Sequence, residues 1–292
     1  MCKPKIEPKI ELIKSKDGFS LKTAIFEPES AAPAIGVIQV SHGFGEHVGM
    51  YYELADFFVS NGYACVVHDM RGHGEMPGLS ERKRQKQLGI VRNYDCLLDD
   101  IGCIRSEIAK KYPDLPVILY GHSMGGNIAL NYLLRRSEGE YAKAILESPW
   151  IKLYKQRPKH LIKAAKFLGR LSGNFAANGN LNVHILTRDK AVAEMITADK
   201  HFHARMSFRL FSQATDAAEY ALEHAAELKI PTLLLGGSKD KIVCIKAARK
   251  FNRRAKGSVT YYEDPEGYHM LRYDAEPTKP EVLRRILEFL QG

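Results

Sequence analysis

The sequence predicts an α/β fold with a mostly parallel central sheet that is covered by helices. Three observations support this prediction. Strand-length apolar runs alternate with segments whose apolar residues recur at helical spacing. Runs such as AIGVIQV at 34–40 are nearly continuous, as expected for strands buried on both faces of a parallel sheet. The chain has 292 residues and is 45% apolar, which is enough for a large core in one α/β unit.

The chain begins with a predicted hairpin. Residues 10–15 and 21–28 are strand-like, and a turn of Lys-Asp-Gly-Phe joins them. A buried strand at 34–43 follows. Residues 52–62 have apolar side chains at helical spacing and end at an Asn-Gly pair, so we predict a helix there. The next apolar run, at 63–70, is predicted to be another buried strand.

The middle of the chain continues the alternation. A helix is predicted at 93–112, because its apolar residues recur at helical spacing and a proline-containing turn ends it. We then predict a strand at 117–123, a helix at 127–136 and a strand at 142–149. Strands that alternate with helices favour parallel neighbours in one sheet.

The alternation breaks between Ile151 and Met206, where no buried strand is evident. It then resumes with a helix at 208–228, a strand at 230–237, a helix at 245–255, a strand at 257–264 and a closing helix at 280–290. We therefore predict that residues 1–150 and 207–292 form one core domain and that residues 151–206 are an insertion in it.

Composition argues against several classes of protein. No apolar run reaches the roughly 18 residues needed to cross a membrane, and the charged N-terminus lacks the apolar core of a signal peptide. The five cysteines are scattered and form no CxxC pair, as expected for reduced thiols in the cytoplasm. His-Phe-His at 201–203 is too small a cluster to predict a zinc site. We expect a cytoplasmic protein that needs no cofactor or metal.

Residues 121–125, GHSMG, fit the pattern G-x-S-x-G between a predicted strand and a predicted helix. A nucleophile on so tight a turn needs small residues two before and two after it, because larger side chains would collide where the backbone doubles back. Ser123 would then lie at the carboxyl edge of the sheet, where amides at the start of the helix favour negative charge. A glycine-rich turn with an incidental serine fits this context less well.

A serine hydroxyl needs a base, and the base needs an acid that orients it. In this architecture the chain order should be serine, acid, histidine. His269 is the candidate base, because it lies in a loop just after the last predicted strand. Asp240 directly follows an earlier strand and is the candidate acid. Glu147 and Asp264 remain the alternatives for the acid.

The same chemistry needs two amides that stabilise an oxyanion. One should be the amide of Met124, the residue after the nucleophile. The other should come from the loop after an early strand, where His-Gly-Phe-Gly at 42–45 offers the amide of Phe44. His42 and His47 are expected to stabilise this loop and not to act in catalysis.

Five motifs together resemble the monoacylglycerol lipase and lysophospholipase branch of the α/β-hydrolases. They are SHGFGEH at 41–47, HDMRGHGE at 68–75, GHSMGG at 121–126, GSKDKIV at 237–243 and GYHML at 267–271. The resemblance runs from about Gly18 to the C-terminus. It implies an α/β-hydrolase fold with a helical cap after the sixth core strand, here residues 151–206, in which LTRD at 186–189 looks like a landmark of the cap.

By this resemblance, Ser123, Asp240 and His269 match the catalytic triad of the family, and Phe44 and Met124 match its oxyanion donors. Two departures stand out. Many relatives have a small residue in place of Phe44, so its ring would narrow the acyl site. The stretch from 76 to 86, MPGLSERKRQK, is more basic than the family pattern suggests.

The predicted cap carries most of the positive charge of the chain. Residues 151–206 contain eleven Lys or Arg and three Asp or Glu, a net +8 within a total of +9. Residues 160–171 place apolar side chains along one helical stripe with lysines opposite. Such a helix either lies on an anionic membrane surface or covers the active site with its apolar face. Nucleic acid is a poorer partner, because no nucleic-acid motif accompanies the charge.

These features predict a serine esterase that hydrolyses a lipid monoester, either a monoacylglycerol or a lysophospholipid, through an acyl-enzyme. Two alternatives stay open. The first is a carboxylesterase for small esters, or a serine peptidase, of the same fold. The second is a hydrolase-fold protein that binds ligands without catalysis, although such a protein should lack a member of the triad.

Overall fold

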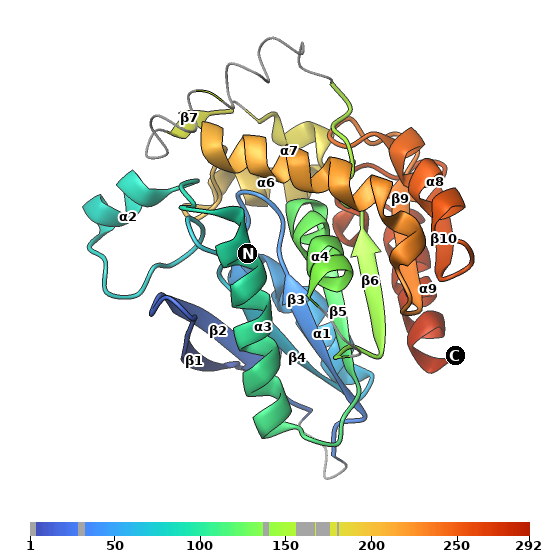
Figure 1. The fold of residues 1–292 in the computed structure, drawn as a ribbon, viewed down its shortest axis with the longest axis horizontal. Helices are drawn as coiled ribbons and strands as arrows, with labels where there is room; N and C mark the ends of the chain where they lie inside the picture. Colours follow the sequence, from blue (N-terminus) through green and yellow to red (C-terminus); the bar gives the residue numbers. More distant parts are fainter. Residues whose placement is uncertain (1–3, 29–32, 137–139, 156–166, 168–175, 180) are drawn as a thin grey trace.

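The computed structural model describes residues 4–28, 33–136, 140–155, 167, 176–179 and 181–292. Its central element is an eight-stranded sheet in the order β1-β2-β4-β3-β5-β6-β9-β10 (Figure 1). The first two strands pair antiparallel, β2 is antiparallel to β4, and the remaining pairs are parallel. The strands are β1 (Lys9–Lys14), β2 (Ser20–Phe26), β3 (Gly36–Ser41), β4 (Tyr63–His68), β5 (Val117–His122), β6 (Lys143–Glu147), β9 (Thr232–Gly237) and β10 (Val259–Asp264). The predicted hairpin, parallel sheet and α/β class are confirmed.

Helices cover both faces of this sheet and follow the predicted alternation (Figure 1). On one face α3, α4, α7 and α8 enclose a core with alternate residues of the strands, and on the other α1 and α9 enclose a second core. The α-helices are α1 (Tyr52–Ser60), α2 (Glu81–Gln87), α3 (Tyr94–Lys111), α4 (Ser123–Arg135), α6 (Lys190–Ala198), α7 (Phe208–Glu223), α8 (Ile245–Arg254) and α9 (Thr278–Gln291). Short 3-10 helices lie at η1 (Val48–Tyr51), η2 (Val183–Ile185), η3 (Ala225–Glu227) and η4 (Leu271–Tyr273).

Local sequence explains why these segments form where they do. The Asn93 side chain accepts a hydrogen bond from the Asp95 amide and so caps α3, whose buried face includes the predicted residues Leu97, Ile101 and Ile104. In β3 and β5 every residue is buried, in keeping with a strand that lies between two helical layers. Because the strands from β4 across the sheet to β10 run parallel, their carboxyl ends lie at one edge of the sheet.

The described part of the predicted insertion contains α6 and a two-stranded sheet of β7 (Ala176–Asn178) and β8 (Arg205–Ser207). Neither short strand is predicted, and β8 crosses the predicted boundary between residues 206 and 207. The expected basic amphipathic helix at 160–171 lies, apart from Phe167, outside the described residues. Within the described ranges, no helix is both long enough and apolar enough to span a membrane.

Candidate active site

Ser123 lies at the turn between β5 and α4 with a φ of 52°, in the left-handed region of backbone space. This conformation strains any residue except glycine and is typical of a nucleophile held on a tight turn. A Cβ atom added at Gly125 would lie 2.1 Å from the Ser41 carbonyl oxygen. One added at Gly121 would lie 2.8 Å from the Gly125 carbonyl oxygen. The predicted need for small residues on both sides of Ser123 therefore has a steric cause.

Ser123, His269 and Asp240 form a continuous hydrogen-bonded relay. The Ser123 Oγ atom lies 2.8 Å from His269 Nε2, and His269 Nδ1 lies 2.7 Å from Asp240 Oδ2. The three residues follow β5, β10 and β9, whose carboxyl ends lie at the same edge of the sheet. All three are buried. Because the carboxylate accepts a hydrogen bond from Nδ1–H, the proton of the imidazole stays on Nδ1. Nε2 therefore keeps its lone pair and can take the proton of the serine hydroxyl.

Backbone amides fix the orientation of Asp240. The amides of Ile242 and Val243 donate to its Oδ1 atom over 2.7 Å and 2.9 Å. These bonds satisfy one carboxylate oxygen and leave Oδ2 free for the imidazole of His269. The aspartate is therefore held by its own turn in the position from which it accepts from His269.

The loop that carries His269 is tied to LTRD at 186–189. The Met270 amide donates to the Leu186 carbonyl over 2.8 Å. Asp274 accepts from the amides of Tyr268 and Arg188 over 2.8 Å and 2.7 Å. The segment singled out in the sequence as a landmark of the cap therefore supports the position of the histidine.

The two alternative acids lie in other networks. Glu147 accepts from the Arg272 amide over 3.0 Å and from its guanidinium over 2.9 Å. Asp264 accepts from the Thr278 hydroxyl over 2.9 Å and from the Glu266 amide over 3.0 Å. Of these three carboxylates, Asp240 is therefore the one that accepts the hydrogen bond from His269 Nδ1.

Glu46 accepts hydrogen bonds that hold the loop with the predicted oxyanion donor in place. The Gly43 amide donates to Glu46 Oε2 over 2.6 Å, and the Tyr51 hydroxyl donates to the same oxygen over 2.5 Å. Phe44 follows directly and lines the same cavity as Ser123. The Phe44 ring meets the rings of His73 and His203 edge to face at 5.6 Å and 5.8 Å, so it is fixed as a wall of this cavity.

The second predicted donor, the amide of Met124, lies in the first turn of α4, where amides lack an acceptor within the helix. The start of α4 packs tightly against the loop after β3, since a Cβ at Gly125 would also lie 2.3 Å from the His42 carbonyl oxygen. Both predicted donor residues therefore belong to segments that border Ser123. His42 accepts from the Met70 amide over 2.9 Å, in agreement with a stabilising role in the loop.

A buried ion network adjoins the relay. Arg272 binds Glu147 over 2.9 Å and Glu46 over 3.2 Å, and His122 Nδ1 lies 3.1 Å from Glu46. Burial disfavours the charged form of Glu46, but the nearby His122 and Arg272 outweigh it and hold the pKa of this carboxyl well below its usual range. Glu46 therefore stays ionised while it orients the Gly43 amide. Sequence reasoning missed Arg272, because its partners are more than 100 residues away.

The hydroxyl of Ser123 faces a cavity of about 180 Å³ with largely apolar walls. Its apolar side chains are those of Phe44, Trp150, Leu153, Leu181, Leu186, Phe202, Ala204, Met206, Phe211, Ile242, Val243 and Met270. The lining residues come from the predicted core and from the predicted insertion. The surroundings favour an apolar group beside the nucleophile.

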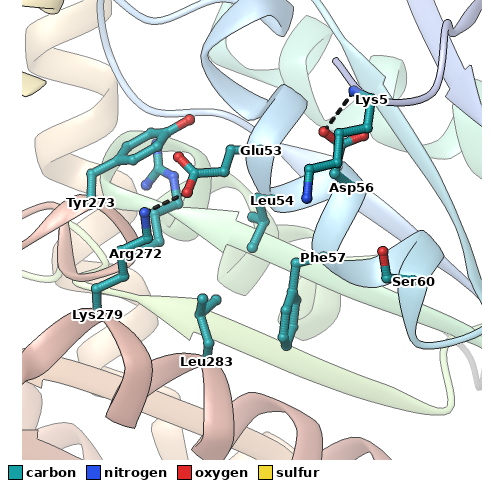
Figure 2. Close-up of a pocket in the computed structure, with 10 residues that line it drawn as sticks. All are labelled: Lys5, Glu53, Leu54, Asp56, Phe57, Ser60, Arg272, Tyr273, Lys279 and Leu283. Carbon is teal, nitrogen blue, oxygen red and sulfur yellow. Dashed lines mark hydrogen bonds and ion pairs between the residues drawn. The ribbon is translucent and has the colours of Figure 1, made fainter. Parts of the chain in front are cut away.

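A second and larger cavity, of about 660 Å³, is lined by none of the three relay residues (Figure 2). Figure 2 shows Leu54 and Phe57 of α1 opposite Leu283 of α9. Lys279 pairs with Glu53 at its side. Arg272, on the same wall, pairs with Glu46 and Glu147. Because Ser123 and His269 line the smaller cavity and not this one, the relay opens into the smaller cavity.

Comparisons with known proteins agree with this geometry. Residues 32–276 match the family described as serine aminopeptidase, S33. The chain is 30% identical to human monoglyceride lipase over 273 residues, which cover 92% of this chain and 86% of that protein. It is 26% identical to a putative monoglyceride lipase of Schizosaccharomyces pombe over 85% of this chain and 65% of that protein. It also matches an uncharacterized abhydrolase domain-containing protein of Dictyostelium discoideum at 28% identity, over 96% of this chain but only 28% of that protein.

Among solved structures, the chain resembles that of a monoacylglycerol lipase of Paleococcus ferrophilus. The TM-score is 0.82 at 27% identity, and the match covers 92% of this chain and 98% of that one. A soluble variant of the Saccharomyces cerevisiae monoglyceride lipase, in complex with a substrate analogue, gives a TM-score of 0.83 over 97% of this chain and 95% of that one. At 22% identity, the second likeness concerns the fold alone.

Proposed function

The chain belongs to the serine aminopeptidase S33 family of α/β-hydrolases, and from this premise we propose that it is a serine esterase that hydrolyses lipid monoesters. One observation carries the proposal: the relay of Ser123, His269 and Asp240 opens into an apolar cavity. The similarity to human monoglyceride lipase favours a monoacylglycerol as the substrate over a lysophospholipid. No cofactor enters the chemistry.

In the first half of the reaction, His269 Nε2 takes the proton of the Ser123 hydroxyl as the oxygen attacks the ester carbonyl. The 2.8 Å contact between these atoms is short enough for direct transfer. Asp240 stabilises the imidazolium that forms and holds its tautomer. His269 then donates the same proton to the leaving alcohol, and the acyl group remains on Ser123.

In the second half, water replaces the alcohol and repeats the sequence on the acyl-enzyme. His269 takes a proton from the water as it attacks, and returns this proton to Ser123 as the fatty acid leaves. In both halves the amides of Phe44 and Met124 stabilise the charge on the carbonyl oxygen. The 2.6 Å bond from the Gly43 amide to Glu46 supports this role, because it fixes the backbone immediately before Phe44.

We also propose that residues 151–206 form a cap on a core of residues 1–150 and 207–292. Leu181, Leu186, Phe202 and Met206 support this division, since they line the cavity from the insertion side. The net +8 charge of the insertion supports peripheral contact of a cytoplasmic enzyme with anionic membranes. Vesicles with 30% anionic lipid should retain the protein at low salt and release it at high salt, whereas retention by neutral vesicles alone would contradict this contact.

A peptidase with specificity for a free amino terminus needs an anion near the scissile bond to bind the ammonium group. Among the described residues that line the cavity, Glu46 is the one carboxylate, and it already pairs with Arg272 and His122. This arrangement favours ester substrates. Cleavage of aminoacyl amides in preference to acyl esters would reverse the assignment.

The decisive experiment compares wild type with Ser123→Ala on a p-nitrophenyl acyl ester and on a panel of monoacylglycerols and lysophospholipids. We expect wild type to hydrolyse monoacylglycerols and to label with a fluorophosphonate probe, and the variant to lose at least a thousandfold in kcat/KM. A folded wild type that neither labels nor turns over any ester would support the ligand-binding alternative. Highest activity on acetyl esters would support a carboxylesterase for small substrates.

A further inference from the structure

A cluster of metal-ligating side chains lies apart from the relay. One ligand atom each from His47, Asp199 and His201 lies within 4.8 Å of the other two. His47 Nε2 is 2.8 Å from Asp199 Oδ2, and the rings of His47 and His201 are 5.2 Å apart between centroids. Within the part of the chain that the structure describes, this is the one group of three such residues that meets these distances.

The three residues come from two segments that are far apart in the sequence. His47 caps η1 in the loop that follows β3, whereas Asp199 caps the end of α6 in the insertion. The side chains of His47 and Asp199 are only 11% and 8% exposed. The Asp199 Oδ1 atom accepts from the His201 amide over 2.8 Å, so the turn places His201 beside the ion pair. Two of the three ligands, His47 and Asp199, are therefore already in contact, whereas the third, His201, is only half-buried.

We propose that His47, Asp199 and His201 bind one Zn²⁺ ion, with a water molecule as the fourth ligand. Two imidazoles and one carboxylate are a donor set that suits Zn²⁺, whereas Mg²⁺ and Ca²⁺ prefer oxygen ligands throughout. In a tetrahedral site with bonds of about 2.0–2.2 Å, ligand atoms lie roughly 3.3 Å apart. Because the three ligand atoms lie within 4.8 Å of one another, the half-buried His201 needs to move inward by at most about 1.5 Å, a shift within the reach of a side-chain rotation.

Binding also changes the proton on His47. Its Nδ1 atom accepts from the Gly49 amide over 3.1 Å, so Nε2 carries the proton that faces Asp199. When Nε2 binds the metal, this proton moves to Nδ1 and the Gly49 amide loses its acceptor. No proton is released in this exchange. The Gly49 amide therefore reports on occupancy, because its hydrogen exchange should become faster as the metal binds.

The ion would connect the insertion to the loop before η1. The two segments already touch, since the His203 amide donates to the Gly45 carbonyl over 3.2 Å. A Cβ at Gly45 would lie 2.0 Å from the His203 carbonyl oxygen, so the contact is close. A metal held by His47 and the 199–201 turn would tie these segments together. The inference is independent of the proposed esterase activity.

The test is titration of the purified full chain with Zn²⁺ in a buffer that does not chelate it. We expect one equivalent to bind by calorimetry and 100 µM free Zn²⁺ to raise Tm by about 3 °C, because a ligand of the folded state stabilises it. Co²⁺ in place of Zn²⁺ should give the visible absorption of a four-coordinate site without a thiolate band. His201→Ala should lose the Tm shift and the Co²⁺ spectrum.

His184→Ala is the matched control, since His184 is an exposed histidine of the same insertion. It should retain both signals. If wild type shows no Tm shift up to 1 mM Zn²⁺, or if His201→Ala responds as wild type does, the proposal is wrong. A thiolate band in the Co²⁺ spectrum would likewise overturn it, because the ion would then be bound to cysteines. Each readout is independent of ester hydrolysis.

Discussion

At the residue scale, position in the sheet decides which carboxylate serves His269. Asp240 and Glu147 are both buried, and both lie at the carboxyl end of a parallel strand. Glu147 is the last residue of β6 and points into the network of Arg272, where burial disfavours its charge but the guanidinium still holds its pKa below the usual range. Asp240 is three residues beyond β9, far enough along the turn to reach the imidazole.

We therefore expect Asp240→Asn to lower kcat by about 10⁴-fold, because an amide at this position favours the wrong tautomer of His269. Glu147→Gln should leave kcat within about tenfold per folded molecule and should lower the free energy of unfolding, since Arg272 would lose a partner. Ester turnover and urea denaturation of both variants measure the two effects. A larger loss of turnover in the glutamate variant would mean that the acid is misassigned.

The glycines around Ser123 allow the backbone segments at this turn to approach closely, because they have no Cβ atom. An added methyl group at Gly125 would overlap the Ser41 and His42 carbonyl oxygens, at 2.1 Å and 2.3 Å, and push α4 away from the oxyanion loop. We expect Gly125→Ala to lower activity at least about 100-fold and Tm by more than about 4 °C. Gly102→Ala is the control, because Gly102 is a helical glycine of α3 whose added Cβ would come no closer than 3.2 Å to its nearest neighbour, the Tyr132 side chain. Equal activities of the two variants would contradict the steric argument.

The relay could be predicted from the sequence because its members lie in short local motifs with a fixed order. Gly121 and Gly125 identify Ser123, and the strand ends identify Asp240 and His269. Arg272 could not be found in this way. Its two partners, Glu46 and Glu147, precede it by 226 and 125 residues, and no local pattern marks such a pairing.

At the scale of elements, polar side chains join α4 to α7 across their interface. The Asn127 side chain donates to the carbonyls of Trp150 and Ala214 over 2.9 Å and 3.3 Å. One turn later, the Asn131 side chain donates to the Ala217 carbonyl over 3.0 Å. Both asparagines are buried. They fix α7 against the helix that starts at the nucleophile.

Asn131→Ala should therefore destabilise the fold by about 1–3 kcal/mol, because it removes a buried donor and leaves the Ala217 carbonyl without its side-chain partner. The free energy of unfolding in urea measures this change. Asn252→Ala on α8, a half-buried position, is the control and should stay within about 0.5 kcal/mol of wild type. Equal effects at the two positions would show that the interface does not depend on this bond.

Elements were predictable where propensity, capping and apolar spacing agree. In α3, the cap at Asn93 and the apolar residues that follow it point to the same helix. By contrast, α2 lies in the basic stretch after Met76, and its sequence ERKRQKQ contains no apolar residue that could show a helical period. The strands β7 and β8 have three residues each and pair across a long separation in sequence, and such short strands carry no period-two signal.

At the scale of the whole molecule, the core encloses histidines as well as apolar groups. His68 and His73 are both buried, and burial lowers the pKa of each to about 4. In the unfolded chain the same groups titrate near 6.5. Between these values the unfolded chain binds more protons than the folded one, so stability must decrease as the pH falls from about 6.5 to 4.

We expect each of these histidines to lower the free energy of unfolding by up to about 1.4 kcal/mol for each pH unit of acidification across this range. The free energy of unfolding, measured in urea at pH 7.5, 6.5, 5.5 and 5.0, should decrease at each step below 6.5. His68→Gln removes one titrating group and should flatten the curve. Stability that is constant or rises on acidification to pH 5 would show that the buried histidines are protonated in the folded state.

The left-handed backbone at Ser123 has a consequence for evolution. A serine there carries strain of about 1 kcal/mol that glycine would relieve. Replacement by glycine should thus give a more heat-resistant but inert protein, and a thermostability screen of a mutant library would enrich it. Selection for turnover keeps the hydroxyl at this position. In a descendant lineage that no longer meets its substrate, we expect glycine to replace Ser123.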